Sequence, residues 1–411
     1  MTKRTDVIAT LDLGTTKTSM LVAEVNDGGM SVVGVGTAPS EGLRKGIVIS
    51  IGKTVESIRK AKHDAEQMSG CLISEVVVGV GGSHVLGVNN HGMVTVKGGE
   101  IHPVDVRRVL EAATAFSMPL DRQLTNVLPK QYIVDEHDGI KDPVGMSGVR
   151  LDCDVHLITA ARSALDNINK CAERSGLRVA EFVANPLASS MAVLEDNERE
   201  LGVVTLDIGG GCSGLSVWLN GGLMHTSVVA AGGNLITQDI ATGLRTPIAC
   251  AEDLKVRYGS AWGKLVAAGE TIVVPGVGGR PDKSLSRHVL TEIIEPRIIE
   301  IFELARREIQ KTGYDDLLAG GIVLTGGAAQ MSGMVELGDE LLNLPVRIGR
   351  PRETRGLSSV LEDPGLAVTY GLAVYASLSR RADIPESMQP WRASRGGEGL
   401  SKWWKKVRDF F

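Results

Sequence analysis

The chain has few aromatic residues, no long apolar run and little net charge. Aromatic residues occupy 4% of its 411 positions. No stretch approaches the roughly 20 consecutive apolar residues that a membrane-spanning helix needs. A formal net charge of −5 gives no reason to expect nucleic acid as a general partner. The hydrophobic fraction of 43% is that of a globular protein, and the length is sufficient for more than one domain.

The cysteines are also few and scattered. None of the five belongs to a CxxC pair or to a Cys/His spacing typical of a metal site, so they indicate reduced thiols. The N-terminal residues lead directly into an apolar strand at 7–13 and lack the features of a signal peptide. Together these absences predict a cytoplasmic protein.

Two short segments repeat one pattern, in which an apolar strand runs into Asp-x-Gly, then a Gly/Thr/Ser-rich turn, then a second apolar strand. They are LDLGTTKT at 11–18 and LDIGGGCSGL at 206–215. The pattern predicts a β-hairpin whose small residues let the backbone approach a ligand closely. Amide groups in such a turn form an anion-binding concavity. Two copies in one chain predict a nucleotide held between two related domains.

The turn residues are the candidate nucleotide contacts. In the first hairpin Lys17 is placed to reach the β- and γ-phosphates, although it could be a solvated strand lysine. Asp12 and Asp207 end equivalent strands, where a carboxylate can hold hydrated Mg²⁺ or merely accept hydrogen bonds from turn amides. In LTGGAAQ, two glycines leave room for a flat ring or a ribose, or simply form a tight strand-to-helix turn. The predicted nucleotide-binding residues are Gly14, Thr15, Thr16, Lys17, Gly209, Gly210, Gly211, Cys212, Gly326 and Gly327.

Elsewhere the spacing of apolar residues predicts a helix over 53–68 and a long helix over 287–311, which Pro296 should kink or interrupt. The segment at 270–287 is predicted to be loop-rich. Residues 84–160 interrupt the regular succession of strands and helices in the first half and are predicted to be an inserted subdomain. The Gly326-Gly327 pair is expected to open a helix.

The last thirteen residues, GLSKWWKKVRDFF, predict an amphipathic helix after a polar linker at 381–398. Trp and Phe opposite Lys and Arg are typical of a helix lying in a membrane interface, and the basic face adds attraction to anionic lipids. The alternative is a helix docked on the body or on a partner protein. The predicted membrane contacts are Leu400, Trp403, Trp404, Lys405, Val407, Phe410 and Phe411.

The order of these motifs resembles the actin/DnaK/sugar-kinase ATPase superfamily and, over essentially the whole chain, the FtsA family of bacterial cell-division proteins. The more specific segments are PVGMSGVRLDCDVHLITA, VPGVGGRPDKSLSRHVLTEIIEPR and GIVLTGGAAQ. The resemblance implies an α/β, actin-like fold with two ribonuclease-H-like domains around a nucleotide cleft, each with an inserted subdomain. The implied division is a first core at 1–83, 161–200 and 364–380 with its insertion at 84–160, a second core at 201–242 and 307–363 with its insertion at 243–306, the linker at 381–398, and the helix at 399–411.

The resemblance also implies a function. Such a protein binds ATP and Mg²⁺, polymerises head to tail on the inner face of the cytoplasmic membrane at the septum, anchors FtsZ filaments through their C-terminal peptide, and helps to recruit later division proteins. Arg287 and Arg297 are candidates for peptide binding or self-association, or ordinary solvated helix charges. A pilus-type actin-like adaptor and a sugar kinase or polyphosphatase are the alternatives. The kinase needs an acceptor-activating carboxylate that no spacing singles out.

The second hairpin departs from the superfamily pattern. Where GGGTxD is common, this chain has Cys212 and Gly214. A thiol is a poorer phosphate partner than a hydroxyl, and a carboxylate that could orient water or metal is missing. We therefore expect ATP binding with slow or negligible hydrolysis.

Overall fold

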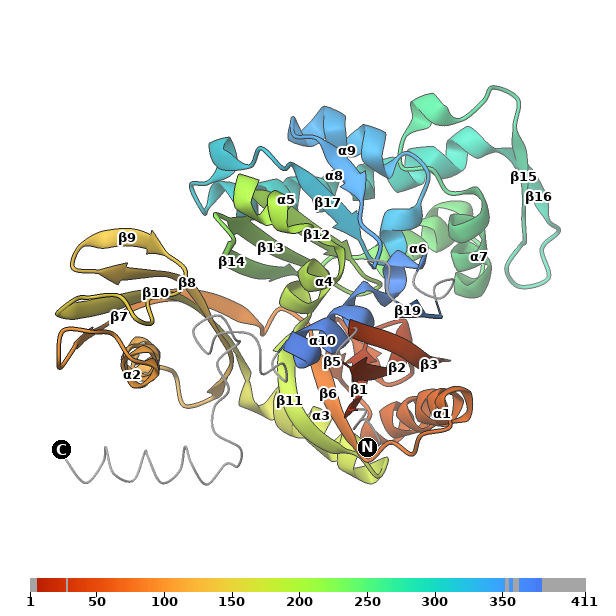
Figure 1. The fold of residues 1–411 in the computed structure, drawn as a ribbon. Helices are drawn as coiled ribbons and strands as arrows, with labels where there is room; N and C mark the ends of the chain where they lie inside the picture. The colour runs from red at the N-terminus through yellow and green to blue at the C-terminus, as the bar shows by residue number, and fades with distance from the viewer. Residues whose placement is uncertain (1–5, 27–28, 352–354, 358–361, 379–411) are drawn as a thin grey trace.

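The computed structural model describes residues 6–26, 29–351, 355–357 and 362–378. A six-stranded sheet in the order β11-β6-β1-β2-β3-β19 forms the first domain (Figure 1). β1 is antiparallel to β2 and parallel to β6, and the β1–β2 pairing closes at Leu13 and Thr18 beside the first Gly/Thr turn. The strands are β1 (Asp6–Leu13), β2 (Lys17–Asn26), β3 (Gly29–Pro39), β6 (Glu75–Val80), β11 (Arg178–Ala184) and β19 (Arg355–Gly356).

Helices cover this sheet, and the helix predicted over 53–68 follows its expected apolar periodicity. α1 (Ile51–Ser69) buries Val55, Ile58 and Ala61, and Gly70 ends it in the left-handed region at φ 69°. The other helices of the first domain are α3 (Arg162–Arg174), α4 (Asn185–Val193) and α10 (Ala367–Leu378). A small hairpin of β4 (Leu43–Arg44) and β5 (Ile47–Val48) precedes α1.

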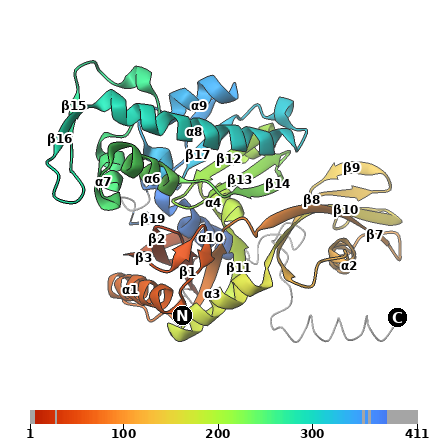
Figure 2. The ribbon, with the colours of Figure 1, turned by 180° about the vertical axis from the view of Figure 1, so that it is seen from behind.

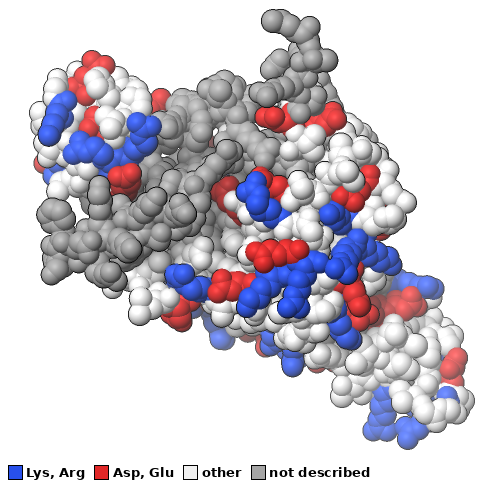
Figure 3. Space-filling view, turned by 90° about the horizontal axis from the view of Figure 1, so that it is seen from below, with Lys and Arg blue, Asp and Glu red and all other residues white. Residues whose placement is uncertain are grey.

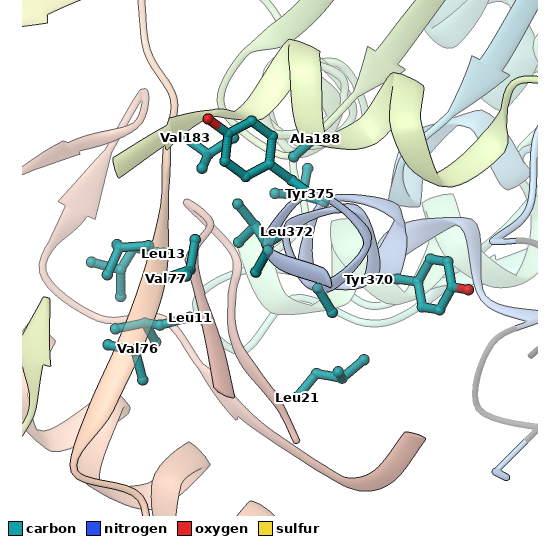
Figure 4. Close-up of a cluster of buried hydrophobic side chains, with 14 of the residues drawn as sticks. Leu11, Leu13, Leu21, Val76, Val77, Val183, Ala188, Tyr370, Leu372 and Tyr375 are labelled. Carbon is teal, nitrogen blue, oxygen red and sulfur yellow. The ribbon is translucent and has the colours of Figure 1, made fainter. Parts of the chain in front are cut away.

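The C-terminal helix α10 completes the core of the first domain. Its side chains are buried almost all round, as expected for a helix without a polar face. Leu372 and Tyr375 point from α10 toward Val77, Val183 and Ala188 (Figure 4). The first domain is therefore built from both ends of the chain.

An antiparallel four-stranded sheet in the order β7-β10-β8-β9 interrupts the first domain between β6 and α3. We call it the inserted sheet. It comprises β7 (Leu86–Thr95), β8 (Arg122–Val134), β9 (His137–Ile140) and β10 (Arg150–Ala161), and α2 (Pro103–Thr114) packs on it. It has its own buried core and extends sideways from the body (Figures 1 and 2).

The inserted sheet also contacts the second domain through a buried histidine. The side chain of His156 is 1% exposed and is hydrogen-bonded through Nε2 to Thr226 Oγ1 at 2.9 Å and through Nδ1 to Asn89 Oδ1 at 2.7 Å. Asn89 Nδ2 in turn donates to the carbonyl oxygen of Met224 at 3.2 Å. Thr226 and Met224 lie on β14 of the second domain, so these bonds join the insertion, which is part of the first domain's chain segment, to the second domain.

A five-stranded sheet in the order β14-β13-β12-β17-β18 forms the second domain. Its strands are β12 (Val203–Ile208), β13 (Ser213–Leu219), β14 (Gly222–Val229), β17 (Ile322–Thr325) and β18 (Val346–Ile348). Its α-helices are α5 (Asp196–Leu201), α6 (Gly233–Leu244), α7 (Ile248–Tyr258), α8 (Arg287–Gln310) and α9 (Met334–Leu342). Short 3-10 helices are η1 (Gly263–Leu265), η2 (Asp315–Leu317), η3 (Gly327–Gln330) and η5 (Pro364–Leu366). The antiparallel β12–β13 hairpin repeats β1–β2, as the sequence predicts.

Three local expectations need correction. The segment expected to be loop-rich forms a projecting hairpin of β15 (Thr271–Val274) and β16 (Lys283–Ser286) (Figure 1). α8 continues through Pro296, so the interruption predicted there is wrong, and the predicted kink stays a prediction; Ile294 and Ile298 on either side of the proline are buried in the core. The Gly326-Gly327 pair opens the single 3-10 turn η3, and α9 begins only at Met334. Among the described residues, none of the helices combines the length and apolar character required to cross a bilayer.

Candidate functional site

Both Gly-rich turns line one cleft between the two domains, with a volume of about 330 Å³. All of the nucleotide and metal candidates from the sequence lie in its wall. They are Asp12, Gly14, Thr15, Thr16, Lys17, Asp207, Gly209, Gly210, Gly211, Cys212, Gly326 and Gly327. The fold therefore brings together residues from three separate parts of the chain.

The two turns face each other at van der Waals distance. A Cβ atom built on Gly210 would lie 2.0 Å from Thr16 Oγ1, and one built on Gly211 would lie 2.4 Å from Thr15 Oγ1. Thr16 Oγ1 also donates to Asn234 Oδ1 at 3.3 Å, across the cleft. Glycine at 210 and 211 is thus required by the close approach of the first turn.

Asp12 and Asp207 form a pair of carboxylates at the ends of β1 and β12. Burial raises the pKa of Asp12 to about 6, against the opposing effects of Lys17 and of a hydrogen bond from Asn185. Burial and, to a smaller extent, the neighbouring charge of Asp12 raise the pKa of Asp207 to about 7, against the opposing effect of a hydrogen bond from Ser189. Two carboxylates held together with little water favour either a proton or a cation between them.

Lys17 has a partner that the sequence analysis missed. Its Nζ atom lies 3.2 Å from Asp363 Oδ2. The other carboxylate oxygen of Asp363 accepts from the amide of Gly365 at 2.8 Å and from Gln330 Nε2 at 2.9 Å. Asp363 thereby caps η5 and joins the C-terminal part of the chain to the first hairpin. The one sequence signal was the Asp-Pro-Gly run, which is typical of a helix N-terminus.

A second missed group lies on α7. Lys255 is 9% exposed, and its Nζ atom contacts Glu252 Oε2 at 2.7 Å, Thr237 Oγ1 at 2.9 Å and the carbonyl oxygen of Gly233 at 3.3 Å. Both Lys255 and Glu252 line the cleft. Their i, i+3 spacing on a helix could have identified the pair, but nothing in the sequence connected it to the turns.

Cys212 occupies the second turn as a neutral thiol. Burial raises its pKa to about 11, and only the positive charge of Lys45 opposes this. At neutral pH it is a weak hydrogen-bond donor and carries no charge. Gly214 packs against the ring of Pro186.

Arg287 and Arg297 lie away from the cleft on α8, and each already has carboxylate partners. Arg287 contacts Glu270 at 2.6 Å and the carbonyl oxygen of Tyr258 at 2.8 Å. Arg297 forms two hydrogen bonds with Asp239, at 2.7 and 3.1 Å, and also contacts Glu300. Their proposed roles in partner binding stay predictions. The membrane candidates at 400–411 and the linker at 381–398 lie outside the described residues.

The amino-acid sequence is similar to those of known cell-division proteins. Residues 204–371 match the family described as cell division protein FtsA, and residues 82–159 match the SHS2 domain inserted in FtsA. Cell division protein FtsA of Pseudomonas aeruginosa is 45% identical over 92% of this chain and 90% of its own length. The chain belongs to the FtsA family of cell-division proteins. The FtsA of Escherichia coli K12 is 39% identical over 99% of this chain and all of its own length.

Solved structures confirm the actin-like fold class. The PilM-PilN type IV pilus biogenesis complex matches with a TM-score of 0.64 and 17% identity, over 90% of this chain and 98% of that one. MreB5 of Spiroplasma citri bound to ADP matches with a TM-score of 0.53 and 14% identity, over 90% and 95%. At these identities the likeness concerns the fold alone. It gives the pilus-type alternative no support beyond a shared architecture, whereas family membership supports cell division.

Proposed function

We propose that this protein is a nucleotide-controlled, membrane-bound adaptor that binds ATP with Mg²⁺ and assembles at the division site. The observation that carries the proposal is the meeting of two Gly-rich turns, Lys17 and two buried carboxylates in one interdomain cleft. The fold relative MreB5 of Spiroplasma citri is described as bound to ADP and, in a second structure, to AMPPNP.

The cleft supports a definite orientation of the nucleotide. The amides of the first turn and the ammonium group of Lys17 suit the phosphates. Gly327 has open space around it at the start of η3, whereas Gly326 is packed against Asp207 and Ile208. Lys255 and Glu252 on α7 offer a donor and an acceptor to ribose hydroxyls. We assign the nucleoside to the α7 side and the phosphates to the hairpins.

Asp12 and Asp207 suit a hydrated Mg²⁺ ion. Both carboxylates are costly to ionise because they are desolvated, and the charge of Asp12 adds to the cost at Asp207; a divalent cation between them would relieve that cost. The ion would supply charge neutralisation for the phosphates, while these carboxylates hold its water molecules in place.

Hydrolysis is expected to be slow or negligible. The neutral thiol of Cys212 and the bare backbone of Gly214 offer no group that could take a proton from an attacking water. A steady-state assay tests this. Brisk ATP hydrolysis by the full chain, abolished by Asp207→Asn, would contradict it.

Membrane attachment is assigned to the helix predicted at 399–411. On the described part of the face in Figure 3, Lys and Arg are interspersed with Asp and Glu, so this face offers no single-sign field for anionic lipids. Co-sedimentation with anionic liposomes and ATP, comparing the full chain with a truncation after Gly399, tests the assignment. Membrane binding that survives truncation would overturn it.

The proposal includes head-to-tail self-assembly, binding of the C-terminal peptide of FtsZ, and recruitment of later division proteins. The candidate peptide site is the region at 243–306, where Arg287 and Arg297 would exchange an internal carboxylate for one from the peptide. Fluorescence anisotropy with a labelled FtsZ C-terminal peptide tests this, using Arg287→Ala and Arg297→Ala. Unchanged affinity in both variants would remove these residues from the site.

A further inference from the structure

The hairpin of β4 and β5 carries a lysine in an unusual backbone conformation. Its two-residue turn is Lys45-Gly46, with φ of 49° and 76°. Such turns favour Asn, Asp or Gly at the first position: Gly has no Cβ atom, the short polar side chains of Asn and Asp hydrogen-bond locally, and most other residues are strained there. Strain of this kind is retained where the surrounding structure fixes it, and it is concentrated at functional sites.

The tip of this hairpin is fixed at the cleft. The amide of Gly46 donates to Thr15 Oγ1 at 3.1 Å, which holds the tip against the first turn. A Cβ atom on Gly46 would lie 2.8 Å from the amide nitrogen of Gly82, and one on Gly82 would lie 3.0 Å from the carbonyl oxygen of Lys45. Gly46 and Gly82 both line the cleft.

A series of contacts across the cleft connects α7 with the hairpin tip at Gly46. Lys255 donates to the carbonyl oxygen of Gly233. The amide of Gly233 in turn donates to the carbonyl oxygen of Gly209, two residues before Gly211. Gly211 faces Thr15, and Thr15 is bonded to Gly46. A nucleotide whose nucleoside lies against α7 therefore extends its terminal phosphate toward the hairpin tip.

A terminal phosphate at that end would find no unpaired lysine in the wall of the cleft. Among the described residues, the wall contains four carboxylates, Asp12, Asp207, Glu252 and Asp363, and two lysines, Lys17 and Lys255. Both lysines are already bonded to one of those carboxylates. Lys45, by contrast, is exposed and has no side-chain hydrogen bond or ion pair with any described residue. Its charge acts on the thiol of Cys212 in the second turn, which is consistent with an ammonium group directed toward the cleft.

We propose that Lys45 binds the terminal phosphate of a nucleoside triphosphate and so distinguishes ATP from ADP. The inference rests on the proposed nucleotide binding. The contact would draw the β4–β5 hairpin over the phosphates, and it is absent when only a diphosphate is bound.

Equilibrium binding of AMPPNP and of ADP to the full chain with Mg²⁺ tests the proposal. Lys45→Asn removes the charge but tolerates the left-handed backbone. We expect it to weaken AMPPNP binding about tenfold or more, the scale of one charge-assisted hydrogen bond, and to change ADP binding less than twofold. Lys45→Arg should restore AMPPNP binding to within about threefold, because it keeps the charge. Arg44→Asn, which removes the neighbouring exposed cation, is the matched control and should change neither affinity.

Equal weakening of AMPPNP and ADP binding by Lys45→Asn would overturn the proposal. So would unchanged AMPPNP binding in Lys45→Asn, or a loss of AMPPNP binding in Arg44→Asn equal to that in Lys45→Asn. Wild-type protein that binds neither nucleotide would instead remove the proposed function itself. The two failures are therefore distinguishable.

Discussion

The Nζ atom of Lys17 lies 3.2 Å from Oδ2 of Asp363, although the two residues are 346 positions apart. Lys17 begins β2, and Asp363 is the N-cap of η5, just before the last helix of the first domain. The lysine that is best placed for a phosphate thus has a protein carboxylate as its partner before any ligand binds.

Replacing Lys17 with Met should weaken ATP binding about tenfold or more, since a charge-assisted contact is lost. Asp363→Asn should act in the opposite direction and strengthen ATP binding, because it frees Lys17 from a competing carboxylate. The side chains are 35% and 40% exposed, so breaking the pair should cost less than about 1 kcal/mol of stability. Isothermal titration measures the affinities. An equal loss of affinity in both variants would show that the pair acts as a structural unit.

Asp207→Asn should stabilise the metal-free protein at pH 8. The folded-state pKa of about 7 lies above the ordinary 3.8, so the folded protein holds this proton more tightly than the unfolded chain. The contribution of Asp207 to the free energy of unfolding is fully present below pH 3.8 and is lost as the pH rises through 7. The variant removes that decline, and we expect a gain of about 1–3 kcal/mol at pH 8 that disappears near pH 4. Urea unfolding at both pH values measures it, with the exposed Asp166→Asn as control. A loss of stability at both values would refute the prediction.

Gly210→Ala should separate the two turns, because its Cβ atom would lie 2.0 Å from Thr16 Oγ1. We expect ATP affinity to fall about tenfold or more and the free energy of unfolding to fall by about 1–3 kcal/mol. Gly52→Ala is the matched control, since a Cβ atom on Gly52 meets nothing within 4 Å. Wild-type affinity in the Gly210 variant would mean that the turns are not in contact when nucleotide is bound.

His156→Gln should reduce the loss of folding stability that accompanies a fall in pH below 6.5. Burial lowers the pKa of His156 to about 3, with smaller contributions from His225 and Lys130, so the folded protein keeps it neutral. Stability from this group is complete above pH 6.5 and is lost as the pH falls toward 3, by about 1.4 kcal/mol per pH unit. Chemical unfolding between pH 6.5 and 5 should therefore show a shallower slope in the variant. The exposed His137→Gln should keep the wild-type slope; if both variants behave alike, His156 is not the group responsible.

The sequence allowed the strands, the two hairpins and the turn residues to be predicted, because each depends on a local pattern. β1 and β12 combine apolar runs with Asp-x-Gly, and α1 has both its periodicity and its terminal glycine. Residues whose role depends on distant partners could not be found in this way. Asp363, Glu252 and Lys255 reach the cleft only through tertiary packing, and nothing near them in the chain indicates a phosphate site.

Local rules also failed where packing outweighed them. Residues 271–274 and 283–286 are too short and too weakly patterned to stand out as strands, and they pair only because the chain between them turns back. Pro296 removes one amide from α8, but buried apolar side chains on both sides of it keep the helix continuous.

The bond between His156 and Thr226 gives the inserted sheet a mechanical role. Thr226 lies on β14, and Val228 of the same strand lines the cleft. A rotation of the second domain about the cleft must therefore either break this buried bond or swing the inserted sheet with it. Because that sheet projects sideways from the body (Figure 1), we expect any rotation of the second domain that preserves this bond to produce its largest displacement at the far end of the sheet, near β9.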